Sequence, residues 1–169
     1  MKRLYIDFDG VIMDTIPKLY AEVEKCGVDL SNQEASRNIY SSFDFRTIVN
    51  DENILNNSIE NIRKLLDSGI FEISILTHIN SLDEGIVKVE YIRKYFKDIT
   101  IILTPRDISK TRMVHSKDAI LVDDYSGNLY EWRDSGGIAV RFNKELDSKG
   151  LDVIDDLSKL IDMFKEEEW

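Results

Sequence analysis

The feature that most constrains this chain is the stretch 5–11, YIDFDGV, in which an apolar run ends in two carboxylates and a glycine. The bulky, branched run from Leu4 to Phe8 predicts a short buried strand with Asp7 at its carboxyl end. Open α/β sheets bind their ligands at that end of their strands. The sequence therefore predicts a ligand site that contains Asp7 and Asp9.

A second acidic pair, Asp123-Asp124, follows another apolar run at residues 119–122. If both strand ends lie at the same edge of the sheet, four carboxylates converge on one point. Such carboxylates repel one another and cannot all stay ionised without a cation. We therefore expect a hard, oxygen-seeking divalent metal at this edge, with Mg²⁺ as the first candidate.

Composition places the chain among globular proteins of one domain, spanning 1–169. The sequence is 43% hydrophobic and 32% charged, and its formal net charge of −10 disfavours long nucleic acids and anionic membranes as partners. A small phosphate ester held by a metal remains compatible with that charge. The single Cys26, the absence of a long apolar run and the charged N-terminal region predict a cytoplasmic protein.

Apolar runs alternate with helix-like patterns along the chain, which predicts a parallel sheet between two helical layers. We expect five strands, at about residues 4–8, 70–76, 99–103, 119–122 and 138–142. A last helix is expected from near Asp152, with a solvated tail at 166–168. Right-handed crossovers would bring the polar strand ends to one edge of the sheet.

Between about residues 15 and 57 the apolar pattern is irregular, which predicts a small helical insertion standing over the strand ends. Its aromatic residues Tyr40, Phe43 and Phe45 have two interpretations. They could form a small core of the insertion, or they could stack against a planar substrate.

The residues expected at the sheet edge have the parts that phosphoryl transfer needs. One carboxylate can attack phosphorus if a metal screens its repulsion from the ester, and a second can protonate the leaving group. The hydroxyl of Thr77 and the ammonium of Lys110 can hold the remaining phosphoryl oxygens. The alternative is that Asp7 and Asp9 merely cap a strand end.

The same residues form a known series of motifs. Residues 7–15, DFDGVIMDT, resemble the first motif of the haloacid dehalogenase (HAD) superfamily phosphatases, and 75–77 resemble the second. Lys110 resembles the third motif, and 121–124, with Asn128, resemble the fourth. The resemblance implies a three-layer, Rossmann-like α/β/α fold with a cap inserted after the first strand. The insertion and residues 103–111 are most similar to the small 5′(3′)-deoxyribonucleotidase branch.

By this resemblance Asp7 is the nucleophile and a Mg²⁺ ligand. Asp9 is the acid and base, and it also offers its backbone carbonyl to the metal. Asp124 aligns best with the direct metal ligand and Asp123 with a residue behind it, although either of the pair could take either role.

The resemblance also implies that Thr77 and Lys110 bind the phosphoryl group, with the backbone N–H of His78 beside them. Lys117 is the alternative lysine, but it lies only six residues before Asp123 and is expected at the surface ahead of that strand.

These expectations lead to one main functional hypothesis and two alternatives. The main hypothesis is a Mg²⁺-dependent phosphomonoesterase with an aspartyl-phosphate intermediate, acting on a small phosphorylated substrate such as a deoxynucleoside monophosphate. The first alternative is a phosphatase or phosphotransferase that uses another small ester. The second is a non-catalytic protein that binds metal or phosphate at the same sheet edge.

Overall fold

A computed structural model describes residues 1–165 of the chain and contains one parallel six-stranded sheet in the order β3-β2-β1-β4-β5-β6. Each neighbouring pair of strands is parallel. The predicted parallel α/β class is confirmed, but the predicted number of five strands is wrong. The strands are β1 (Lys2–Ile6), β2 (Phe71–Ile79), β3 (Thr100–Pro105), β4 (Ile120–Asp123), β5 (Ile138–Phe142) and β6 (Asp152–Ile154).

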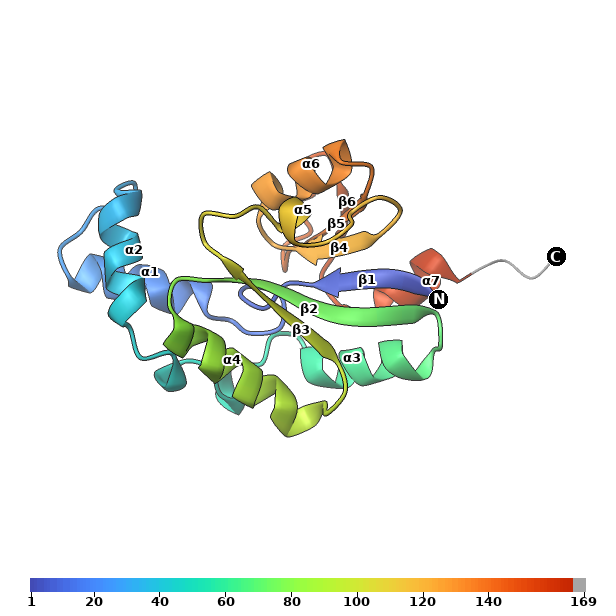
Figure 1. Cartoon of the computed structure of the whole chain (residues 1–169), viewed down its shortest axis with the longest axis horizontal. Helices are drawn as coiled ribbons and strands as arrows, with labels where there is room; N and C mark the ends of the chain where they lie inside the picture. The colour runs from blue at the N-terminus through green and yellow to red at the C-terminus, as the bar shows by residue number, and fades with distance from the viewer. Residues whose placement is uncertain (166–169) are drawn as a thin grey trace.

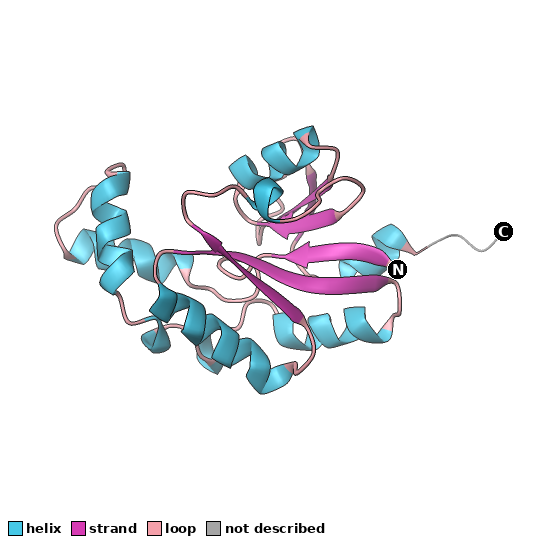
Figure 2. Cartoon of the chain, viewed as in Figure 1, coloured by secondary structure: helices cyan, strands magenta, loops and turns pink. Residues whose placement is uncertain are grey.

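Helices cover both faces of this sheet (Figures 1 and 2). Helices α3 and α4 lie on one face, α5 and α6 lie on the other, and α1 and α2 stand beyond the end toward which β1 points. The helical elements are α1 (Ile16–Lys25), α2 (Gln33–Ser42), η1 (Phe45–Thr47), η2 (Asp51–Asn53), α3 (Ser58–Asp67), α4 (Leu82–Tyr95), α5 (Lys110–Met113), α6 (Ser126–Asp134) and α7 (Lys159–Phe164). The segment that we expect to be an insertion therefore holds α1, α2, η1 and η2.

Alternating side chains of β1 supply the two cores of the sheet, because successive residues of a strand point to opposite faces. Leu4 belongs to the larger cluster, which also contains residues of α3, α4 and α7. Tyr5 belongs to the smaller cluster and meets Trp132 of α6 edge-on, with ring centroids 5.4 Å apart. The indole Nε1 of Trp132 donates to the carbonyl of Ala119 at 2.9 Å, so this large side chain is buried without an unmet donor.

The C-terminal region differs from the prediction. Where a single helix is expected from near Asp152, the structure has a three-residue strand, β6, followed by the six-residue helix α7. Ile154 and Leu160 are both buried, so the apolar residues pack on the sheet as expected although the element between them differs. The predicted tail at 166–168 lies outside the described residues. Within residues 1–165 no helix is long and apolar enough to cross a membrane.

Candidate active site

The loop after β1 is fixed by its own backbone and by the core. The backbone N–H of Asp7 donates to the carbonyl of Val122 at 2.9 Å, which extends the pairing with β4 by one residue. The carbonyl of Phe8 accepts from the N–H groups of Ile12 and Met13, and all three of these side chains are fully buried. Apolar anchors on both sides therefore hold the acidic residues of the loop in place.

Gly10 closes this loop under the second acidic pair. Its φ is +76°, a conformation that glycine adopts without steric cost. A Cβ at this position would lie 2.2 Å from Oδ2 of Asp124, so the Asp124 side chain occupies the space that any other residue would need. The D-x-D-G pattern thus combines a turn with a close approach between two strand ends.

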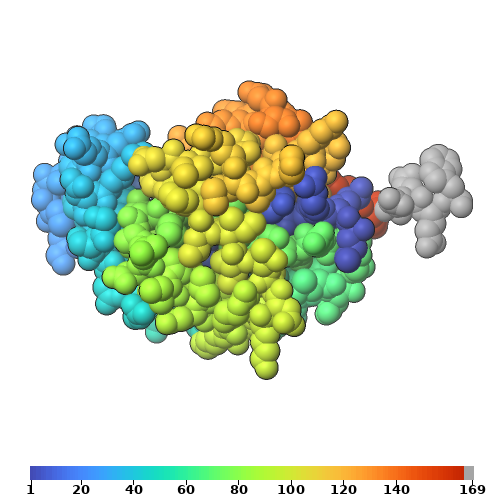
Figure 3. All heavy atoms as spheres, viewed as in Figure 1, coloured from blue at the N-terminus to red at the C-terminus, as the bar shows by residue number. Residues whose placement is uncertain are grey.

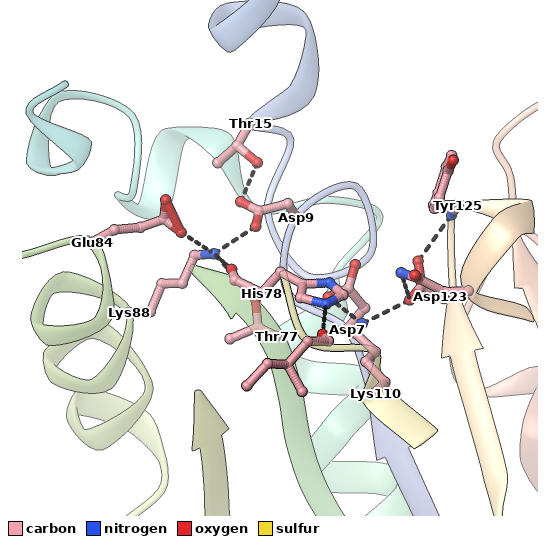
Figure 4. Close-up of polar contacts among 12 residues, drawn as sticks. Asp7, Asp9, Thr15, Thr77, His78, Glu84, Lys88, Lys110, Asp123 and Tyr125 are labelled. Carbon is pink, nitrogen blue, oxygen red and sulfur yellow. Dashed lines mark hydrogen bonds and ion pairs between the residues drawn. The ribbon is translucent and has the colours of Figure 1, made fainter. Parts of the chain in front are cut away.

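Three carboxylates meet at the ends of β1 and β4. Asp7, Asp123 and Asp124 each offer an oxygen, and these oxygens all lie within 4.8 Å of one another. The ammonium of Lys110, at the start of α5, donates to Asp7 at 2.9 Å and to Asp123 at 2.7 Å (Figure 4). Residues more than 100 positions apart in the sequence are thereby joined in one charged cluster.

Asp123 is the most firmly held member of the cluster. Besides Lys110, its carboxylate accepts from the side-chain amide of Asn128 at 3.0 Å and from the backbone N–H of Tyr125 at 2.9 Å. Burial is the largest influence and acts to raise the pKa of Asp123, but the charge of Lys110 and the hydrogen bonds from Lys110, Tyr125 and Asn128 together lower it. Asp123 is therefore an ionised partner of Lys110.

The pKa values of the other two carboxylates, Asp7 and Asp124, are raised. Burial, followed by the neighbouring charge of Asp123, raises the pKa of Asp7 to about 7 even though Lys110 acts against the shift. Burial and the same neighbour raise the pKa of Asp124 well above its usual value. A divalent cation would relieve the repulsion that causes both shifts, since its charge favours the ionised forms. Oxygen donors this close together fit the preferences of Mg²⁺.

The side chain of Asp9 lies apart from this trio. Its Oδ1 accepts from the hydroxyl of Thr15 at 2.7 Å, and its Oδ2 accepts from the ammonium of Lys88 at 2.6 Å (Figure 4). The trio of possible metal ligands therefore contains Asp7 but not the carboxylate of Asp9. The expectation that Asp9 offers its backbone carbonyl to a metal stays a prediction.

The other predicted site residues lie at the end of β2 and in α5. Thr77 is fully buried, while the imidazole Nε2 of His78 lies 2.8 Å from the carbonyl of Ile108. Burial lowers the pKa of His78, which favours a neutral ring that donates to this carbonyl. Of the two candidate lysines, Lys110 lies in the cluster, whereas Lys117 is exposed. The roles of these residues in binding phosphate stay predictions.

A cavity of about 420 Å³ opens above the carboxylates and reaches α1 and α2. In the space-filling view these helices form a lobe at one end of the molecule (Figure 3). Tyr40 and Phe45 are buried in the core and also line the cavity. Stacking of these rings against a substrate stays a prediction. Tyr20, Arg37 and Arg106 line it as well. The cavity can therefore hold a molecule with one end at Asp7 and the other against aromatic and basic side chains.

Sequence reasoning missed Lys88, which contacts Asp9. The sequence contains only a weak indication of this residue, because a lysine four residues after Glu84 on a helix is typical of an exposed ion pair. In the structure both of these side chains are buried, and their charged atoms lie 2.9 Å apart. Buried charges in the interior of a helix are rare unless they have partners.

Comparisons with known proteins identify the fold that this chain shares with other proteins. No protein-family model and no curated protein matches the chain. Among solved structures, the magnesium-bound HAD hydrolase YfnB of Bacillus subtilis is similar at 12% identity and a TM-score of 0.65, over 98% of this chain and 99% of that one. The D,D-heptose 1,7-bisphosphate phosphatase of Burkholderia thailandensis is similar at 16% identity and a TM-score of 0.59, over 98% and 100% of the two chains.

A dehalogenase is also similar, at 15% identity and a TM-score of 0.60, over 98% of each chain. Because phosphatases and dehalogenases share this architecture, the fold does not choose between their reactions. The similarity extends along nearly the full length of the chain. The chain has the fold of the HAD-superfamily hydrolases.

Proposed function

We propose that this protein is a Mg²⁺-dependent phosphomonoester hydrolase in which Asp7 is the nucleophile. The observation that carries the proposal is the cluster at the strand ends, where Asp7 lies against Lys110 and within 4.8 Å of Asp123 and Asp124. A carboxylate placed beside an ammonium and a cation site is suited to attack an anionic phosphate ester. Asp7 and Asp124, with the backbone carbonyl of Asp9, would hold the metal, and Asp123 would act behind them by fixing Lys110.

The chain's own residues account for both halves of the reaction. An oxygen of Asp7 bonds to phosphorus while the bond to the ester oxygen breaks, and Asp9 gives that oxygen its proton. A water then attacks the phosphorus of the aspartyl-phosphate and gives a proton to Asp9, which releases phosphate and restores Asp7. Lys110 and Thr77 donate to phosphoryl oxygens throughout. Bound Mg²⁺ supplies charge screening between the carboxylates and the ester.

The cavity supports a small substrate with a planar or partly apolar leaving group. Its volume of about 420 Å³ is in the range of small-molecule sites. Tyr20 and Tyr40 offer aromatic surface, and Arg37 and Arg106 offer positive charge. We therefore propose a deoxynucleoside monophosphate as the substrate, with the segment 15–57 acting as a cap over it.

The first experiment tests the reaction. We expect hydrolysis of p-nitrophenyl phosphate with added Mg²⁺ and its loss in Asp7→Asn, while Asp67→Asn, at an exposed carboxyl at the end of α3, keeps the activity. Beryllium fluoride with Mg²⁺ should form an adduct at Asp7 that mimics the aspartyl-phosphate. A folded protein that neither hydrolyses any ester in a broad panel nor forms this adduct would contradict the proposal.

The second experiment tests the substrate. Nucleoside monophosphates, sugar phosphates and small organic phosphates are compared by kcat/KM, and we expect deoxynucleoside monophosphates to be preferred. Product analysis with a competing alcohol separates hydrolysis from transfer, since a transferase would form a new ester. A preference for sugar phosphates would contradict the nucleotide assignment and leave the phosphatase assignment intact.

A further inference from the structure

Lys88 is a buried cation that the proposed reaction leaves unexplained. It belongs to α4, is 0% exposed, and its ammonium lies among four oxygens. These are Oδ2 of Asp9 at 2.6 Å, Oε2 of Glu84 at 2.9 Å, the carbonyl of His78 at 3.0 Å and Oγ1 of Thr77 at 3.1 Å. An ammonium has three protons, so these acceptors use all of its donor capacity.

Glu84 pairs with Lys88 in the protein interior, so the buried ammonium has a buried counter-charge. Glu84 is 2% exposed and accepts from the backbone N–H and side-chain amide of Asn80 as well as from Lys88. A buried charge is costly unless it is paired and hydrogen-bonded, and both conditions are met here. Lys94 of the same helix shows the contrast, because its ion pair with Asp51 is more than half exposed.

The contacts of Lys88 join the loop after β1 to the C-terminal part of β2. Asp9 follows β1, whereas Thr77 and His78 lie near the C-terminal end of β2, so one ammonium fixes the proposed acid and base relative to the proposed phosphate-binding residues. With the hydroxyl of Thr15 on Oδ1 of Asp9, each oxygen of that carboxylate has a fixed donor. The carboxylate is therefore held in a single orientation at the edge of the cavity, which both Asp9 and Glu84 line.

We propose that Lys88, supported by Glu84, is a positioning residue that orients the carboxylate of Asp9 for proton transfer to the leaving group. This inference rests on the proposed phosphatase function and deepens it. Lys88 is buried beneath the cavity lining and acts through Asp9 without touching the substrate. Its removal should therefore impair the steps in which Asp9 moves a proton.

Leaving groups of different basicity distinguish this role from a general loss of structure. A p-nitrophenolate ion leaves without protonation, whereas an alkoxide needs a proton from Asp9 as the bond to phosphorus breaks. The quantity to measure is kcat/KM, because it reports the first half of the reaction. In Lys88→Met, kcat/KM for an alkyl phosphate should fall by about 100-fold, the size typical of general acid catalysis, and that for p-nitrophenyl phosphate by about 3-fold or less.

Three further variants make the test specific. In the Asp9→Asn background, adding Lys88→Met should lower kcat/KM for the alkyl phosphate by no more than about 3-fold. The effects of two substitutions are not additive when one residue acts through the other. Lys94→Met removes the same charge from an exposed position of α4 and should leave both substrates unaffected. If Lys88→Met does not fold because Glu84 is left unpaired, Glu84→Gln/Lys88→Met removes both charges and takes its place.

The outcomes separate this inference from the function on which it rests. Equal losses for alkyl and aryl esters, a full additional loss in the Asp9→Asn background, or no loss at all would each overturn the role of Lys88 while the phosphatase assignment stands. Wild-type protein that hydrolyses no ester overturns the proposed function, and the role of Lys88 falls with it. A selective loss on alkyl esters that disappears in Asp9→Asn supports the inference.

Discussion

Single residues decide whether the acidic cluster can form, and Gly10 is the clearest case. Its φ of +76° and the 2.2 Å approach of a Cβ to Asp124 Oδ2 mean that Gly10→Ala brings both backbone strain and a displaced carboxylate. We expect the free energy of unfolding to fall by about 1–3 kcal/mol. We also expect Mg²⁺-dependent activity to fall by at least about 10-fold, since small displacements of catalytic groups are costly. Urea unfolding and ester hydrolysis measure the two effects.

Gly69→Ala is the matched control for this prediction. Gly69 also has a positive φ, +68°, but nothing lies within 4 Å of the position of its Cβ. This variant should lose about 1 kcal/mol of stability from backbone strain and keep its activity. Equal losses of activity in the two variants would show that strain, and not contact with Asp124, is responsible.

The raised pKa of Asp7 predicts how the metal-free protein responds to pH. The pKa of Asp7 is about 7 in the folded state and 3.8 in the unfolded chain, so between these values the folded state keeps a proton that the unfolded state releases. Stability therefore falls as pH rises from about 4 to about 7, and the loss is complete above pH 7. Asp7→Asn has no such proton to release. At pH 8, in EDTA, we expect it to be more stable than wild type by on the order of 2 kcal/mol.

Urea unfolding of both proteins at pH 4.5 and pH 8 checks this sign, and the advantage of Asp7→Asn should be much smaller at the lower pH. Asp67→Asn, at an exposed position, serves as the control and should show no comparable change with pH. An Asp7→Asn protein that is less stable than wild type at both values would mean that the hydrogen bond from Lys110 outweighs the cost of burying the charge.

At the scale of elements, α7 has only six residues and depends on packing for its stability. The side chain of Leu160 is buried in the core, with 0% of its surface exposed to solvent, whereas Met163 of the same helix is 40% exposed. We expect Leu160→Ala to lower the free energy of unfolding by about 2–4 kcal/mol and Met163→Ala by less than about 1 kcal/mol. Urea denaturation measures the free energy of unfolding of both variants. Similar losses in the two would mean that α7 does not pack on the sheet through Leu160.

The same region shows how far local patterns predict elements. Five of the six strands are predictable because each coincides with a mainly apolar segment at least four residues long. The sixth, β6, has three residues and, within residues 1–165, pairs with β5 alone. Ile154, Leu157 and Leu160 are spaced by three, which is typical of a helix, so the pattern favoured one continuous helix. The pairing with β5, which overrides that pattern, is a tertiary contact that local spacing does not contain.

Some residues of the candidate site could be predicted from the sequence, and others could not. The sequence predicted that the carboxylates of Asp7, Asp9, Asp123 and Asp124 converge because strand ends of a parallel sheet share an edge. The structure brings Asp7, Asp123 and Asp124 together, but it leaves the carboxylate of Asp9 apart. Lys88 could not be predicted, since its contact with Asp9 spans 79 positions and its spacing from Glu84 is that of a surface pair. Motifs that end strands are thus visible in the sequence, whereas a side chain that reaches the site from the interior of a helix is not.

At the scale of the whole molecule, the net charge of −10 means that any salt should stabilise the fold somewhat by screening self-repulsion. A cation bound at Asp7 and Asp124, in the cluster that Asp123 completes, should act differently, because it binds the folded state alone. Protons compete for Asp7, whose pKa is about 7, so the effect of the metal should be larger at pH 8 than at pH 5.5. Dependence on the ion and on pH therefore separates a specific site from general screening.

The resulting prediction is a thermal shift that requires both Mg²⁺ and the intact cluster. At pH 8 and about 100 times the dissociation constant, Mg²⁺ should add about 2.7 kcal/mol, which is a rise in Tm of roughly 5–10 °C for a chain of this size. NaCl at equal ionic strength should give a much smaller rise, and so should Mg²⁺ added to Asp124→Asn. Asp67→Asn should respond to Mg²⁺ as the wild type does. Equal shifts with NaCl and MgCl₂ in the wild type would mean that the three carboxylates attract cations only as part of an acidic surface.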